Sequence, residues 1–169
     1  MAKCSLEVIK KNADELATKI NASGTLLPTY GYSLDEAHPH IEVDDKGLMH
    51  YVTVERGQEQ SRETTDELNT LLYWIFKDVT FAMACNYELK NRIEDKDCRR
   101  IMFEKQEELL GMLSDIWKQK QKEEHRSTLE KHPFDDLAGR RASYCRDLRQ
   151  QGYAENEITQ LAYEKYPTN

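Results

Sequence analysis

Hydrophobic residues recur every three or four positions along most of the chain, which is the period of an amphipathic helix. The first such stretch runs from Ser5 to Ser23, with Gly24 as its expected stop. The most hydrophobic stretch, Thr65 to Tyr87, leaves so little polar surface that we expect it to be central. A third stretch begins at residues 95–97 and predicts one long helix that ends before Pro133.

Between Gly24 and Thr64 the period changes to two, which is typical of strands. The runs His40 to Asp44 and Met49 to Glu55 both alternate, and Asp45-Lys46-Gly47 between them is a turn signal. These features predict a β-hairpin. The polar run Gln58 to Glu63 adds an edge strand. We therefore expect a small antiparallel sheet of two to four strands.

The end of the chain has the pattern of a helical hairpin, with helices at Asp135 to Gln151 and Glu155 to Tyr166 separated by Gly152. The predicted fold class is α+β and mainly helical. A small antiparallel β-hairpin sheet packs on two long helices and a C-terminal helical hairpin follows. Residues 1–133 form the α+β domain, and residues 134–169 form a hairpin packed on it or appended to it.

The chain is acidic, with 31 Asp and Glu residues against 24 Lys and Arg residues and a net charge of −7. This balance argues against binding to nucleic acid or to an anionic membrane, because both need a clustered positive surface. It suits a basic protein partner, since complementary charge speeds encounter. The acidity is equally compatible with a role in solubility alone.

Four cysteines are scattered along the chain without a CxxC pair, and residues 1–5 lack the apolar run of a signal peptide. We therefore expect a cytoplasmic protein with reduced thiols. His38, His40 and His50 are the main histidine cluster, and we interpret them as surface or turn residues, so that no metal is expected. Gly-rich phosphate loops are absent, and no cofactor is predicted.

Charged residues cluster at the predicted strand end and at the junction of the long helices. They are Glu55, Arg56, Glu88, Arg92, Asp97, Arg99 and Arg100. One interpretation is an acid/base site or an anion pocket, in which Arg99 or Arg100 reaches Glu55 or Glu88. The other is a structural polar network. We favour the structural network, because no motif brings a nucleophile or a proton carrier to these groups, and we predict no enzyme activity.

The middle of the chain resembles a known family. The matching segments are Leu27-Pro28-Thr29-Tyr30, Pro39 to Asp44, Tyr51 to Gly57, Glu67 to Phe76, Asn91 to Glu94 and Asp97 to Arg100. Together they carry ERG, YWIF, NRI and D-x-RR patterns over residues 26–133. This set resembles the Imm63-type immunity proteins of bacterial polymorphic toxin systems.

The resemblance implies a protein that binds and neutralises a cognate toxin domain, such as a nuclease, by stoichiometric occlusion and without chemistry of its own. The candidate partner-binding residues are acidic and surround the hairpin: Glu36, Glu42, Asp44, Asp45, Glu59 and Glu63. The alternative is a helical adaptor or regulatory protein that forms a homodimer and has no toxin partner.

Overall fold

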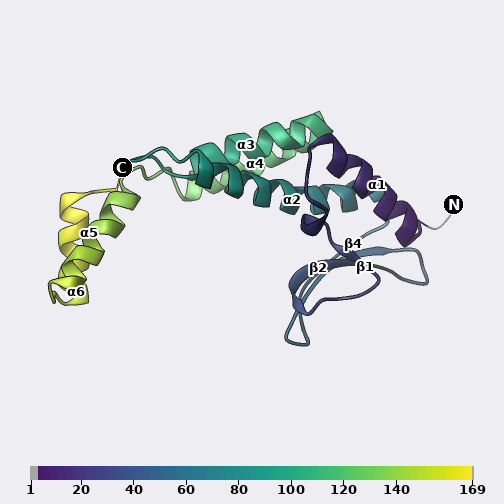
Figure 1. Cartoon of the computed structure of the whole chain (residues 1–169), viewed down its shortest axis with the longest axis horizontal. Coiled ribbons are helices and arrows are strands. Elements are labelled where there is room, and N and C mark those ends of the chain that lie inside the picture. The colour runs from purple at the N-terminus through teal and green to yellow at the C-terminus, as the bar shows by residue number, and fades with distance from the viewer. Residues whose placement is uncertain (1–3, 169) are drawn as a thin grey trace. The chain divides into compact units, whose positions relative to one another are not determined.

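The fold is α+β and mainly helical, as predicted, in a computed structural model that describes residues 4–168 (Figure 1). The described elements are α1 (Leu6–Lys19), a short 3-10 turn (Gly24–Leu26), β1 (Thr29–Tyr30), β2 (Glu36–Val43), β3 (Met49–Glu55), β4 (Gln58–Thr65), α2 (Leu68–Lys90), α3 (Arg99–Leu113), α4 (Asp115–Lys131), α5 (Ala138–Gln150) and α6 (Glu155–Lys165).

The chain divides into two compact units. The first comprises residues 1–83 and 106–119, and the second comprises residues 84–105 and 120–169. Helices α2, α3 and α4 each contribute residues to both units. The separation of a C-terminal hairpin at residue 134 stays a prediction.

Helix α1 forms because its apolar residues share one face and because Ser5 caps its start. The Ser5 hydroxyl accepts a hydrogen bond from the Val8 backbone N–H at 3.3 Å, and Ile9 and Ala13 are fully buried. The helix ends at Lys19, earlier than Gly24. Asn21, with a φ of 54°, takes the left-handed conformation that ends the helix, a role that asparagine fills when glycine is absent.

The sheet has the strand order β1-β2-β3-β4, and the predicted hairpin of β2 and β3 is confirmed by its antiparallel register, which sets Ile41 opposite Tyr51. Strand β4 adds the predicted polar edge, exposed along nearly its whole length. The sheet is mixed and not wholly antiparallel, because the two-residue strand β1 pairs in parallel with β2. So short a strand carries no alternation that a sequence pattern could reveal.

The core of the first unit joins α1, the inner face of the sheet and the helices (Figure 1). It contains buried residues from each of these elements: Ile9, Ala13, Ile41, Met49, Tyr51, Leu71, Ile75, Phe76, Val79, Leu110 and Trp117. Each large side chain buried this way contributes about 1.5–3 kcal/mol. The Tyr51 hydroxyl also donates a hydrogen bond to Asp78 Oδ2 at 2.8 Å, which links β3 to α2.

The stretch from residue 97 to Pro133 is two helices, and the prediction of one long helix is wrong. Helix α3 stops at Leu113, and α4 begins at Asp115 and runs back along it. In the first unit a Cβ on Gly111 would meet the Lys118 side chain, and in the second unit Phe103 stacks on His125 at 3.8 Å between ring centroids. The segment after Lys118 therefore packs on α3.

Helices α5 and α6 form the predicted helical hairpin within the second unit. Leu148, Ile158 and Ala162 are buried between them, and Gly152, with a φ of 86°, makes the turn. The Arg149 guanidinium donates to the Glu155 carboxylate at 2.6 Å across that turn.

Candidate functional site

The acidic residues around the hairpin do not form one patch. Asp44 and Asp45 lie at the turn between β2 and β3, whereas Glu36 lies at the opposite end of β2. On the open face of the sheet, Glu42 and Glu59 flank the same arginine. Glu63 on β4 is opposite Tyr51, on the side that faces the core.

Asp44 builds the turn that it occupies. One carboxylate oxygen accepts hydrogen bonds from the backbone N–H groups of Lys46 and Leu48, each at 2.9 Å, and the other lies 3.5 Å from His50 Nε2. The bond from Leu48 is the main reason that the pKa of Asp44 lies below its usual range. Replacing Asp44 would therefore change the turn as well as the surface charge.

Arg62 neutralises two of the candidate carboxylates. Its guanidinium donates to Glu42 and to Glu59, each at 2.7 Å, and these bonds lower the pKa of both carboxyl groups. Glu42 Oε1 also lies 3.0 Å from Nε2 of His40, whose side chain is almost fully buried. These two carboxylates therefore already have cationic partners within the chain.

The residues proposed as a structural polar network lie in separate places. Glu55 and Arg56 flank the turn between β3 and β4, with 4.0 Å between Arg56 Nε and Glu55 Oε1. In the second unit, Glu88 is buried and accepts two hydrogen bonds from Arg92, at 2.8 and 2.9 Å. This contact is the main cause of the lowered pKa of Glu88.

Arg99 and Arg100 bind partners other than Glu55 and Glu88. Arg99 donates to Asp97 at 2.6 Å and to the carbonyl oxygen of Pro133 at 2.9 Å. Arg100 donates to Asp136 at 2.8 Å, and its guanidinium lies 4.2 Å from the ring centroid of Phe134. Both arginines thus join the start of α3 to the segment that follows α4.

Two aspartates complete this junction by reciprocal hydrogen bonds. The Asp97 carboxylate accepts from the Asp135 backbone N–H, and the Asp136 carboxylate accepts from the Asp97 backbone N–H, each at 2.9 Å. The residues after Pro133 were missed by sequence reasoning. A signal was present, because Asp135 and Asp136 follow closely after Pro133, and aspartate near proline is typical of turns whose side chains bind backbone N–H groups.

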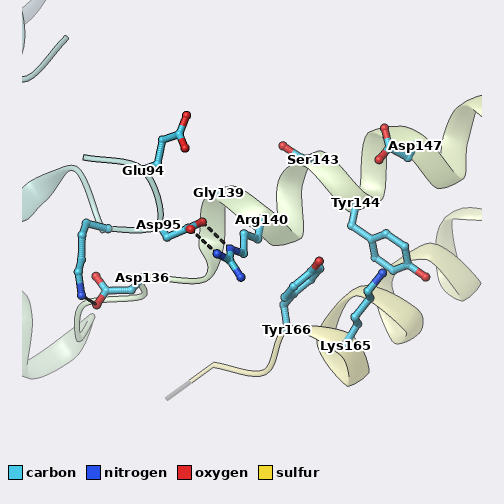
Figure 2. A pocket seen from close by; sticks show the side chains of 11 residues that line it. Glu94, Asp95, Asp136, Gly139, Arg140, Ser143, Tyr144, Asp147, Lys165 and Tyr166 are labelled. Atoms are coloured by element: carbon cyan, nitrogen blue, oxygen red, sulfur yellow. Dashed lines mark hydrogen bonds and ion pairs between the residues drawn. The ribbon is translucent and has the colours of Figure 1, made fainter. Parts of the chain in front are cut away.

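An open cavity of about 540 Å³ lies beside this junction (Figure 2). Tyr144, Tyr166 and Lys165 line one side, with the Lys165 ammonium 4.0 Å from the Tyr144 ring centroid. On the other side Arg140 forms an ion pair with Asp95. The cavity combines aromatic rings with charges of both signs, so it offers polar contacts and lacks a paired nucleophile and base.

Within residues 4–168 no group of three or more His, Cys, Asp or Glu side chains is arranged to hold a metal ion. None of the helices in this part of the chain combines the length and the apolar character needed to cross a membrane.

The fold and these surfaces define an α+β protein in which several charged side chains, among them Arg62 and Asp136, are engaged in structural contacts. Comparison with protein families then gives the particular class, because the family model described as Immunity protein 63 (Imm63) matches residues 44–127. This match confirms the resemblance to Imm63-type immunity proteins found in the sequence. No curated protein and no solved structure matches the chain.

Proposed function

We propose that the chain is an immunity protein that binds a cognate bacterial toxin domain and neutralises it by occlusion, without catalysis of its own. The observation that carries this proposal is the Imm63 match over residues 44–127, which includes β3, β4, α2 and α3 entirely. An inhibitor of this kind needs a stable body and a complementary surface, and no reactive group.

The net charge of −7 supports a basic partner. A toxin domain that acts on nucleic acid has such a surface, because it must contact phosphates. An acidic chain would be steered toward that surface and would cover it. The partner-facing role of Glu36, Glu42, Asp44, Asp45, Glu59 and Glu63 remains part of this proposal.

Co-expression tests the function directly. The C-terminal domain of the protein encoded by the adjacent gene should stop bacterial growth when it is expressed alone. Cells should tolerate that domain when this chain is expressed with it. Purified together, the two should elute as one complex in gel filtration. Equal killing with and without this chain would contradict the proposal.

A charge reversal tests the turn between β2 and β3. The variant is Asp45→Lys, and Asp44 is left unchanged because its carboxylate holds the turn by accepting two backbone hydrogen bonds. Weakened binding by Asp45→Lys would support this turn as a contact, and unchanged binding would remove it from the proposed surface.

A helical adaptor that dimerises is the second candidate. It is favoured by Leu89 and Ile93, large apolar side chains that are 64% and 56% exposed. Analytical ultracentrifugation of the chain alone separates the two functions, because an adaptor would be dimeric without any toxin domain.

A further inference from the structure

Unfavourable backbone conformations gather where the loop between β1 and β2 meets the turn between β3 and β4. Asp35, Ala37 and Arg56 have φ values of 57°, 57° and 52°. Side chains with a Cβ rarely adopt this left-handed region, and hairpin turns prefer Asn, Asp or Gly there. Neither Ala37 nor Arg56 is such a residue, so the sequence at this end of the sheet is not optimised for stability.

Charge adds a second unfavourable feature at the same place. Glu36 of β2 is directly opposite Glu55 of β3, and like charges in this cross-strand position destabilise a sheet. Among residues 4–168 Glu36 makes no ion pair. The nearest cation to Glu55 is Arg56, at 4.0 Å, with a side chain that is 91% exposed.

The loop and the turn are nevertheless tied together. Asp35 Oδ1 accepts a hydrogen bond from the Gly57 backbone N–H at 2.6 Å, and the Asp35 carbonyl oxygen accepts from the Arg56 backbone N–H at 3.5 Å. These bonds fix the unfavourable conformations in place. Strained residues that are held this firmly tend to cluster at binding sites, where preorganisation is useful.

Two large apolar side chains project from the same loop. Tyr32 and Leu34 are 59% and 48% exposed, and they line an open cavity of about 670 Å³ together with Leu27 and Pro28. Tyrosine and arginine are the residues that most often dominate binding energy at protein interfaces. Tyr32 and Arg56 are both available for that role.

We infer that the sheet-end surface, formed by Tyr32, Leu34, Glu36, Glu55 and Arg56, receives the toxin domain. A cationic side chain of the toxin lies between Glu36 and Glu55 and relieves their repulsion, while Tyr32 and Leu34 pack on an apolar part of the toxin surface. This inference rests on the proposed function. It locates the contact at the opposite end of β2 from Asp44 and Asp45.

The test compares stability with affinity in single variants. Glu36→Gln, Glu55→Gln and Arg56→Asn should leave the melting temperature unchanged or raise it, since each removes an unfavourable feature. The binding partner is the C-terminal toxin domain of the protein encoded by the adjacent gene, in a catalytically inactivated form. Each of the three variants should weaken binding to this domain by about tenfold or more, and Tyr32→Ala should do the same. Binding is measured by isothermal titration calorimetry.

Matched controls lie in the second unit. Glu104→Gln removes one exposed carboxylate, and Tyr153→Ala removes a tyrosine that is 45% exposed. Both should bind like the wild type.

Each contrary outcome has its own meaning. If the wild type does not bind the toxin domain, the proposed function fails and the inference falls with it. If the wild type binds and the sheet-end variants bind equally well, the function stands and this inference is overturned. Lowered melting temperatures in the Gln and Asn variants would also overturn it, because these residues would then be structural.

Discussion

At the scale of single residues, two glycines near β1 differ in backbone conformation and in the space around them. Gly31 has a φ of 81°, and a Cβ there would lie 3.1 Å from Leu6 Cδ1, whereas nothing lies within 4 Å of a Cβ on Gly24. Gly31→Ala should lower the free energy of unfolding by about 1–2 kcal/mol, because alanine is disfavoured in the left-handed region. Urea unfolding measures this.

Gly24→Ala is the matched control. Its backbone is not left-handed, so alanine should be neutral or should stabilise the fold by up to about 1 kcal/mol through the unfolded state. Equal losses in both variants would contradict the argument from conformation.

Asp136 gives the junction of the second unit a pH dependence. The hydrogen bonds from Arg100 and from the Asp97 backbone N–H hold the pKa of Asp136 well below its usual range. A carboxyl group whose pKa falls on folding stabilises the protein above its unfolded pKa of about 3.9. That contribution is lost as the pH falls through the lower folded value.

Asp136→Asn should therefore lower the melting temperature at neutral pH, and its difference from the wild type should shrink steadily below about pH 4. Thermal unfolding followed by circular dichroism over a pH series measures this. Asp147→Asn is the control, because the Asp147 carboxylate makes no hydrogen bond or ion pair among the described residues. A pH-independent difference for Asp136→Asn would rule out the ion pair as its cause.

Sequence reasoning identified acidic residues near the hairpin but could not tell which of them are already neutralised. Glu42 and Arg62 are 20 positions apart and meet only because three strands pair in one register. The bulge between Thr53 and Val54 then brings Glu59 to the same face as Arg62. The alternation of polar and apolar residues along a strand does not predict where a bulge shifts the register by one residue.

At the scale of elements, the start of α4 is anchored by Trp117. Its ring lies 6.2 Å from Phe76 and 6.1 Å from Tyr73, between ring centroids, and it is almost fully buried. Trp117→Ala should lower the free energy of unfolding by about 3–5 kcal/mol, through lost burial and the cavity that remains. Chemical denaturation measures the loss.

The neighbouring residue provides the control, because Ile116 is 76% exposed. Ile116→Ala should change the free energy of unfolding by no more than about 0.5 kcal/mol. If Ile116→Ala lowered the free energy of unfolding as much as Trp117→Ala, α4 would not have the orientation that buries Trp117 and exposes Ile116.

The break between α3 and α4 could not be predicted from the apolar period. Leu109, Leu110, Leu113, Ile116 and Trp117 continue the period through the turn, and no proline or glycine stands at Ser114. The hairpin of β2 and β3 was predictable because alternation and an Asp-Lys-Gly turn indicate the same structure. Local sequence patterns therefore predict that hairpin, whereas tertiary packing determines where the chain turns between α3 and α4.

At the scale of the whole molecule, charge is distributed and much of it is paired. Arg62, Arg99 and Arg100 each bind carboxylates in the chain, so the net charge of −7 does not show which carboxylates are free to contact a partner. The long-range field still follows the net charge, because pairing removes local contacts and leaves the sum unchanged. Composition therefore predicts attraction to a basic partner better than it predicts the contact face.

This distinction gives a kinetic prediction for the complex in the proposed function. If the field of the acidic chain steers a basic toxin domain, raising the salt from about 0.02 M to about 0.5 M should lower the association rate constant tenfold or more. The dissociation rate constant should change far less, because it depends on close contacts such as those inferred for Tyr32 and Arg56. Surface plasmon resonance over a salt series separates the two constants. An association rate constant that did not respond to salt would mean that the acidity serves solubility and not encounter, even if the complex forms.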